Sequence, residues 1–405
     1  MVTIDFERFS LENGLRVVLS PERDVPVVAV NLWYDVGSRN EREGRTGFAH
    51  LFEHMMFQGS EHVPETAHFA LIEKAGGSLN GSTWLDRTNY YETVPAHYLE
   101  LALWLEADRM GGLLPAMTQE KLDNQRDVVK NERRWRVDNQ PYGDWDERIQ
   151  AMVYPPDHPY HHSVIGSMED LDAASLEDIE QFFRTYYAPN NAVLTLCGQF
   201  DADAARDRIE HHFGGIPAGP PIPPIPGRTE VPATLDSPVE ATVEQDISLP
   251  RTYFAFRIPP YGHEDYYPAA VAAHVLAWGK ASRLYRGLVR ERRLAQDVVA
   301  FAFPIVVGAS MFVLWATAAP DADRATLERE LQREIDGLRE VEPAEIERAV
   351  AMLEARQLTE LQRVDARADM LSMFTTMFDD PGRINTELDR IRAVTPERVR
   401  DFADR

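Results

Sequence analysis

The sequence predicts an α+β protein built from two domains. Its 405 residues exceed the usual length of one domain, and 44% of them are hydrophobic, which is ample for large cores. A proline-rich stretch at residues 216–227 divides the chain almost in half, and strand-like and helix-like segments alternate on both sides of it. Such a stretch continues neither a helix nor a central strand. We therefore expect domains at residues 1–216 and 229–405, joined by a linker at residues 217–228.

Local signals in the first half predict strands and helices in alternation. The strand segments are rich in Val, Leu and aromatic residues, which suit a pleated, half-buried surface. The helical segments are bounded by residues that begin or end helices, as with a start at Thr118 and a stop at Gly76. We expect strands at residues 16–19 and 27–33, two within 78–94, and one at 192–197, with helices at residues 46–57, 65–74, 97–110, 118–137 and 176–186.

The second half shows a similar order. Strands are expected at residues 239–247 and 252–257, followed by an apolar helix at residues 267–278. This helix takes the place that residues 46–57 hold in the first half, but it contains only His274. A single histidine on an apolar helix face is usually a core residue, and we interpret His274 in that way.

Composition and charge exclude several classes of protein. The net charge of −24 argues against nucleic acids and anionic membrane surfaces as partners. The chain has no run of 18 apolar residues, and residues 1–7 lack the pattern of a signal peptide. We therefore expect a cytoplasmic protein, or a periplasmic one if a leader has been removed. The only cysteine, Cys197, rules out an internal disulfide and lies in an expected buried strand.

The strongest functional signal is the segment from His50 to His54, which reads H-x-x-E-H with Glu53 in the acidic position. Only 12 residues are histidine, so this arrangement would rarely arise by chance. On a helix, positions i, i+3 and i+4 share one face, so the three polar side chains point the same way. Two neutral imidazoles can then bind zinc, and the carboxylate can take a proton from a zinc-bound water. This order of residues is the inverzincin signature.

A catalytic zinc ion normally has a third protein ligand, and the helix expected at residues 118–137 offers candidates. Gln125 and Glu132 are seven residues apart, so they lie on one face of that helix, two turns apart. Spacing alone does not separate Glu132 from Glu120 or Glu147 as the third ligand.

The chain resembles the pitrilysin family of zinc metallopeptidases, most closely its bacterial branch that is similar to mitochondrial processing peptidase. The resemblance runs through most of the first half and rests on residues 47–59, 76–80, 126–132, 138–143, 158–160 and 165–166. It implies that Glu132 is the third ligand. Gln125 then stands where the family often has a second glutamate; its amide can hydrogen-bond a ligand but brings no charge.

The resemblance also implies the architecture. Two similar domains, related by internal duplication, would each hold a mixed, mostly antiparallel sheet with helices packed on it. The metal site would be kept only in the first domain, and peptides would be cut in an enclosed cavity. The family usually adds one more strand after the helix that is expected to begin at Thr395, so the chain is expected to be trimmed or part of a longer one.

Each site residue receives a role by this resemblance. One Zn²⁺ per chain would be held by His50, His54 and Glu132, with Glu53 as the general base of a metalloendopeptidase. Asn80 matches a family position near the substrate, where it would hold peptide backbone as an added strand. An ordinary residue at the end of a strand explains Asn80 equally well.

The family binds substrate with an arginine and a tyrosine from its second half, spaced R-x6-Y. Arg290 matches the arginine, but the tyrosine position falls on Asp297, or on Gln296 if one residue is deleted. A carboxylate cannot donate a hydrogen bond, and an amide donates only if well aimed. We therefore expect the zinc subunit of a heterodimer, whose homologous partner carries the Arg/Tyr pair, with a homodimer as the alternative. The competing interpretation is that Tyr285, Gln296 or another donor takes the place of the tyrosine. Its peptide substrates would be basic if acidic residues line the cavity.

Two other interpretations stay open. A non-catalytic scaffold or assembly subunit of the same fold has no use for a general base, so the complete set of His50, Glu53, His54 and Glu132 argues against it. A purely structural zinc site is disfavoured because such sites normally have four protein ligands.

Overall fold

The computed structural model describes residues 3–405, which form two compact units. Unit 1 comprises the chain up to Glu147 together with Asp157–Gly227 and Glu360–Asn385. Unit 2 comprises Arg148–Pro156, Arg228–Thr359 and Thr386–Arg405. The passage of the main chain from unit 1 to unit 2 after Gly227 lies within residues 217–228, where the linker is expected.

The units differ from the expected continuous domains because each takes a segment from the other half of the chain. Residues 148–156 belong to unit 2, and residues 360–385 belong to unit 1. The proline-rich stretch is also held in place rather than free. Ile216 packs against the core of unit 1, and the Gly219 N–H donates a hydrogen bond to Asn190 Oδ1 at 2.7 Å. Long-range contacts, which local sequence patterns do not report, decide this division.

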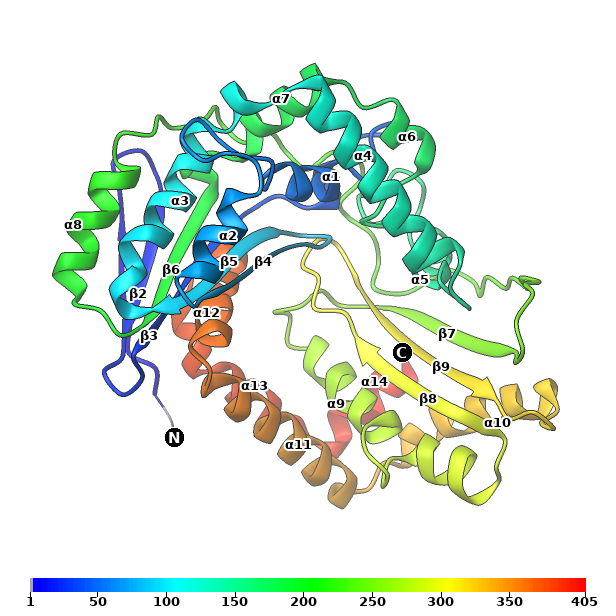
Figure 1. The fold of residues 1–405 in the computed structure, drawn as a ribbon. Coiled ribbons are helices and arrows are strands. Elements are labelled where there is room, and N and C mark those ends of the chain that lie inside the picture. Colours follow the sequence, from blue (N-terminus) through cyan, green and yellow to red (C-terminus); the bar gives the residue numbers. More distant parts are fainter. Residues whose placement is uncertain (1–2) are drawn as a thin grey trace. The chain divides into compact units, whose positions relative to one another are not determined.

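Unit 1 is built on a six-stranded mixed sheet with the strand order β1-β2-β6-β3-β5-β4 (Figure 1). Only the β2–β6 pair is parallel, so the sheet is mostly antiparallel, as expected. The strands are β1 (Glu7–Ser10), β2 (Arg16–Pro21), β3 (Val27–Tyr34), β4 (Ser78–Thr83), β5 (Thr88–Pro95) and β6 (Ala192–Gly198). Strand β4 forms one edge of this sheet.

Helices cover both faces of the unit 1 sheet (Figure 1). On one face, Leu32 and Tyr34 of β3 join side chains of α1 and α3 in a single core. On the other face, Ser372 Oγ of α12 donates a hydrogen bond to Thr195 Oγ1 of β6 at 2.8 Å. The helices are α1 (Phe48–Met55), α2 (Ala67–Lys74), α3 (Leu99–Gly112), α4 (Gln119–Arg133), α6 (Met168–Asp172), α7 (Leu176–Tyr186), α8 (Ala202–Phe213) and α12 (Val364–Phe378). Helix α5 (Trp145–Val153) crosses into unit 2.

Unit 2 has a three-stranded antiparallel sheet with the order β7-β9-β8. Its strands are β7 (Arg251–Ile258), β8 (Ala295–Ala302) and β9 (Ser310–Ala318). Its helices are α9 (Tyr266–Ala277), α10 (Arg324–Asp336), α13 (Glu387–Arg392) and α14 (Pro396–Asp404), while α11 (Pro343–Leu361) runs across the unit boundary. His274 of α9 is buried, as interpreted from the sequence.

One expected strand is wrong. Residues 239–247 alternate polar and apolar side chains, yet they form no strand and are mostly exposed, including Val239 and Val243. An alternating segment becomes a strand only when a neighbouring strand satisfies its backbone groups, and no such partner lies beside this one in the described chain.

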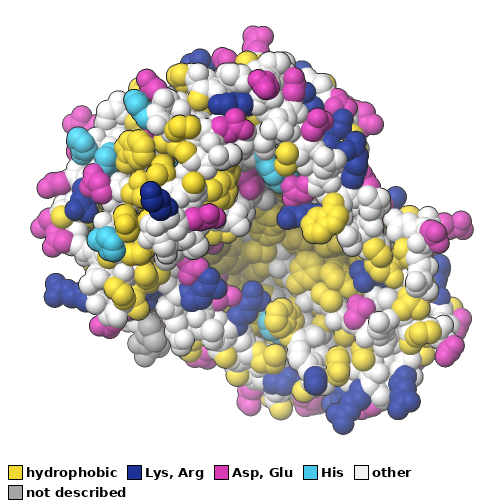
Figure 2. Space-filling model, in the orientation of Figure 1, with side chains coloured by type: hydrophobic (Ala, Val, Ile, Leu, Met, Phe, Trp, Pro, Cys, Tyr) yellow, Lys and Arg dark blue, Asp and Glu magenta, His cyan; other side chains and the backbone are white. Residues whose placement is uncertain are grey.

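Three features of the structure concern the expectations drawn from composition and charge. Acidic and basic side chains are interspersed over the face shown in Figure 2, so the net charge is not gathered into one acidic field there. No helix within residues 3–405 combines the length and the apolar character needed to cross a bilayer. Cys197 is fully buried in β6.

Candidate metal centre

The H-x-x-E-H residues lie on α1, as the sequence predicts. Phe48, Leu51 and Phe52 on one side of the helix are buried in the core of unit 1, so the opposite side presents the polar residues. Gly47 occupies the N-terminal cap position directly before this helix, and its φ is +85°. A Cβ atom at Gly47 would lie 2.6 Å from the Ile165 carbonyl oxygen, so only glycine fits there.

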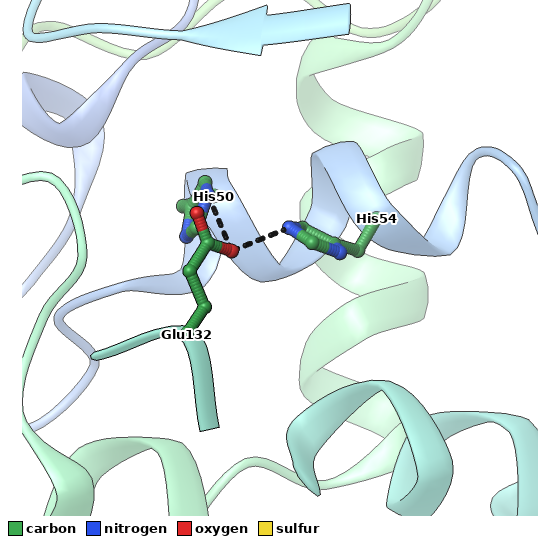
Figure 3. Close-up of side chains that lie close together, drawn as sticks. All are labelled: His50, His54 and Glu132. Atoms are coloured by element: carbon green, nitrogen blue, oxygen red, sulfur yellow. Dashed lines mark ion pairs between the residues drawn. The ribbon is translucent and has the colours of Figure 1, made fainter. Parts of the chain in front are cut away.

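The third candidate metal ligand, Glu132, lies near the C-terminal end of α4. Thr118 caps this helix, as expected, by accepting a hydrogen bond from the Lys121 N–H. Glu132 Oε2 lies 3.2 Å from His54 Nε2 and 3.7 Å from His50 Nε2 (Figure 3). One ligand atom from each of these three residues lies within 4.8 Å of the other two.

The geometry separates Glu132 from the two rival glutamates. Glu120 is exposed in the first turn of α4, at the opposite end from Glu132. Glu147 forms an ion pair with Arg133 and accepts a hydrogen bond from Ser163 Oγ at 2.6 Å. Arg133 also donates to the Gly166 carbonyl oxygen at 2.6 Å, which ties the end of α4 to the loop beside the start of α1.

The three residues fit a zinc ion by both chemistry and spacing. Two atoms that each lie about 2.1 Å from a tetrahedral zinc ion are about 3.4 Å apart. The two Glu132–histidine separations, 3.2 and 3.7 Å, bracket that value. The set of two imidazoles and one carboxylate leaves a fourth position for water, as catalytic zinc sites do.

The electrostatics suit metal ligands. Burial, with a smaller effect of His54, lowers the pKa of His50 to about 4, so its ring is neutral and can donate a lone pair at neutral pH. The hydrogen bond from His54 lowers the pKa of Glu132. Glu132 Oε1 forms an ion pair with Arg136 Nη1 at 2.7 Å, which leaves Oε2 facing the histidines.

Glu53 lies beside the edge strand. A Cβ atom at Gly81 of β4 would lie 3.2 Å from Glu53 Cγ, so the glycine allows the strand and the acidic side chain to approach closely. Burial raises the pKa of the Glu53 carboxyl. Sequence reasoning missed the roles of Gly81 and Arg133, although both lie within or beside the stretches that carry the family resemblance.

The other predicted site residues are placed as follows. Gln125 is buried on α4 but makes no hydrogen bond to either histidine in the described part of the chain. Asn80 is exposed on β4, and its Oδ1 accepts the Gly81 N–H at 2.9 Å. In unit 2, Arg290 is exposed on a π-helix (Tyr285–Glu291) and has no ion-pair partner among residues 3–405. Gln296 occupies a β-bulge between Ala295 and Asp297.

A second buried cluster of metal-ligand type lies in the core of unit 1. One ligand atom each of His68, Glu92 and Glu106 lies within 4.8 Å of the others. Arg109 donates two hydrogen bonds to Glu106, one of them from Nε to Oε2 at 2.9 Å. Burial, then the charge of Glu106, raises the pKa of Glu92 well above its usual range. Because the arginine already neutralises Glu106, we interpret this cluster as a charge-balanced part of the core.

Comparisons with known proteins follow the same division of the chain. A family model described as insulinase (peptidase family M16) matches residues 16–154, which include all four residues of the metal centre. A model described as peptidase M16 inactive domain matches residues 173–353.

Curated relatives match most of the chain. Zinc protease PqqE of Helicobacter pylori is 29% identical over 383 residues, covering 93% of this chain and 82% of that protein. An uncharacterized zinc protease of Streptomyces coelicolor is 25% identical, covering 98% and 86%. Among solved structures, a protease from Helicobacter pylori has a TM-score of 0.93 at 26% identity, covering 100% of this chain and 96% of that one. A peptidase M16 inactive domain from Pseudomonas fluorescens has a TM-score of 0.84 at 18% identity, covering 98% and 94%, and shows the fold alone.

Proposed function

Because the chain belongs to the insulinase, or pitrilysin, family of peptidases (peptidase family M16), we propose that it is a zinc-dependent endopeptidase subunit. The observation that carries this proposal is the convergence of His50, His54 and Glu132 within 4.8 Å, with Glu53 on the same helix as the histidines. A site with three ligands and a neighbouring carboxylate supports hydrolysis rather than zinc storage.

The side chains of the site would have different roles in the reaction. His50 Nε2, His54 Nε2 and Glu132 Oε2 would hold the zinc ion. When bound, zinc supplies a Lewis acid that makes water more acidic and polarises the substrate carbonyl. Glu53 takes a proton from the attacking water and later gives one to the leaving amine. Arg136 keeps Glu132 oriented by binding its other oxygen.

The position of strand β4 at the edge of its sheet supports the proposal that the substrate is a peptide. This strand forms an open edge of the unit 1 sheet, and an edge strand presents unpaired N–H and C=O groups to which an extended peptide can add. Gly81 in the same strand packs against Glu53, so a peptide added along β4 would pass near the general base. Asn80, exposed on this strand, would contact the peptide backbone.

Residues in the second half of the chain support the proposal that a partner subunit is needed. Neither Gln296 nor Asp297, the two residues that can be aligned with the family tyrosine, has a phenolic hydroxyl to donate to an oxyanion. Arg290 is exposed and without an ion-pair partner within residues 3–405, so it is free to bind a substrate carbonyl. We infer that a homologous subunit with an R-x6-Y pair completes the enzyme. We also propose basic peptides as substrates and the cytoplasm as the location, or the periplasm if a leader precedes this chain.

The test measures bound zinc and cleavage of an unstructured basic peptide by the full chain, with and without a homologous R-x6-Y subunit. We expect one zinc per chain and cleavage that a chelator abolishes. A Glu53→Gln variant should keep its zinc and lose turnover by at least about a hundredfold. A chain that binds zinc but stays inactive with every such partner would instead favour the scaffold function.

A further inference from the structure

A fully buried carboxylate holds the start of the helix that carries the metal ligands. Glu41 Oε2 accepts the Gly47 N–H at 2.9 Å, and Glu41 Oε1 accepts the Ala49 N–H at 2.7 Å. Its side chain has no exposed area. Gly47 is the N-terminal cap position of α1, and Ala49 lies in the first turn, directly before His50. Glu41 itself is outside the metal centre and has no part in the proposed chemistry.

The start of α1 needs an external cap. The first N–H groups of any helix lack partners within the helix, and a Ser, Thr, Asp or Asn at the cap position usually supplies an acceptor. Here that position must be glycine because of the close contact with Ile165, so no cap side chain exists. Glu41 supplies the two acceptor oxygens from six residues before Gly47. Burial raises the pKa of this carboxyl, and the hydrogen bonds from the Ala49 and Gly47 N–H groups oppose that rise.

Glu41 is itself fixed to the turn between β4 and β5. In the short helical turn before it (Ser38–Asn40), the Ser38 N–H donates to the Trp84 carbonyl at 3.2 Å and the Arg39 N–H to the Leu85 carbonyl at 3.0 Å. Arg39 Nη1 also donates to the buried Asp86 carboxylate at 3.1 Å. Glu41 therefore connects α1 to the same hairpin whose Gly81 packs against Glu53.

A second segment reaches the same carboxylate. His162 Nδ1 lies 3.5 Å from Glu41 Oε2, in the loop that also contains Gly166. The Gly166 carbonyl accepts from Arg133, the residue after Glu132. The start of α1, the end of α4 and the β4–β5 turn thus meet around one buried carboxylate and its neighbours.

We propose that Glu41 is a positioning residue for the metal centre: its carboxylate fixes the first turn of α1 so that His50 and His54 meet Glu132. This inference deepens the proposed function, because it takes the bound ion to be zinc. Residues behind the ligands commonly change metal affinity by 10- to 100-fold when replaced. Loss of one of two cap bonds should weaken zinc binding by at least about tenfold.

The test compares Glu41→Gln with Glu43→Gln in the full chain. Gln keeps the shape of Glu41 but can accept through only one of its two terminal atoms. Glu43 is an exposed glutamate in the same loop, so its variant makes the same replacement of a carboxyl by an amide without touching α1. The zinc Kd is measured by competition with a chelator, at a temperature where circular dichroism shows each variant folded. We expect weaker binding for Glu41→Gln and an unchanged Kd for Glu43→Gln.

A role confined to global stability would lower the melting temperature but leave the zinc Kd of the folded protein unchanged, which would overturn the proposal. If Glu41→Gln does not fold, Glu41→Asp, which keeps the charge but shortens the side chain, takes its place in the comparison. Hydrogen exchange of the zinc-free wild type gives a separate check, since the Gly47 and Ala49 amides should be protected and rapid exchange would overturn the proposal. A wild-type chain that binds no zinc would refute the proposed function instead.

Discussion

Replacement of Arg109 by methionine should destabilise the protein by about 3–5 kcal/mol, the usual effect of removing one partner of a buried ion pair. The Arg109 side chain is only 2% exposed and its partner Glu106 is fully buried. The guanidinium also lies 4.2 Å from the Tyr90 ring centroid and 5.2 Å from that of Phe57. Methionine fills much of the same space but leaves the Glu106 charge beside Glu92 with no cation.

The loss of folding free energy caused by Arg109→Met should be larger at higher pH. The pKa of Glu92 is already raised in the folded state, mainly by burial, and Arg109 is the group that lowers it. Without Arg109 the folded-state pKa of Glu92 rises further above that of the unfolded state, in which glutamates titrate near pH 4.3, so the variant loses stability over a wider pH range than the wild type. When the folded state binds more protons, stability falls as pH rises above the unfolded pKa. The difference between wild type and variant should therefore be larger at pH 8 than at pH 5.

Urea unfolding followed by circular dichroism, with zinc removed, measures this difference. Arg184→Met is the control: Arg184 pairs with Glu180 on the surface of unit 1 at 3.7 Å, with an exposed fraction of 66%, so its loss should cost less than about 1 kcal/mol. Adding Glu106→Gln to Arg109→Met should recover part of the loss by removing the stranded charge. A loss below 1 kcal/mol, or one independent of pH, would refute the argument.

Three further predictions concern Gly81, Glu92 and Cys197. Gly81→Ala should keep zinc but lower turnover at least about tenfold, because the added methyl group displaces Glu53. Gly215→Ala is the control and should not lower turnover, because Gly215 has open space around it; equal turnover of the two variants would contradict the proposed contact. Glu92→Gln should raise the free energy of unfolding more at pH 8 than at pH 4, because it removes a group whose raised folded pKa costs stability as pH rises; a pH-independent effect in urea titrations would exclude this. Burial raises the pKa of the Cys197 thiol, so alkylation followed by mass spectrometry should detect modification only after unfolding.

Local sequence signals were sufficient for the helices and strands that position the site. The spacing of His50, Glu53 and His54 predicted their common helix, and Thr118 marked the start of the helix that ends near Glu132. Residues 176–186 were predicted as a helix with the bounds that α7 has. These elements follow from neighbours within a few positions, through helix periodicity and capping.

Contacts between distant residues were not predictable in the same way. Choosing Glu132 over Glu147 required either the resemblance or the pairing of Glu147 with Arg133 in the structure. Nothing in the local pattern marks Glu41 as the cap of a helix that begins after it, because six residues of irregular chain lie between Glu41 and Phe48. The alternation at residues 239–247 resembled a strand because periodicity cannot report whether a partner strand exists.

Unit 1 is completed by α12, a segment from near the end of the chain, and this sets the order in which the protein can fold during synthesis. Asp369 Oδ1 of α12 accepts hydrogen bonds from Trp33 Nε1 and Asn89 Nδ2, both at 2.8 Å. These polar groups on β3 and β5 leave the ribosome long before their acceptor. Roughly 130 residues separate the last two segments of unit 1, which at typical elongation rates means a delay of about 7–26 s. During that interval one face of the unit 1 sheet is uncovered, so the nascent chain should bind chaperones until α12 arrives.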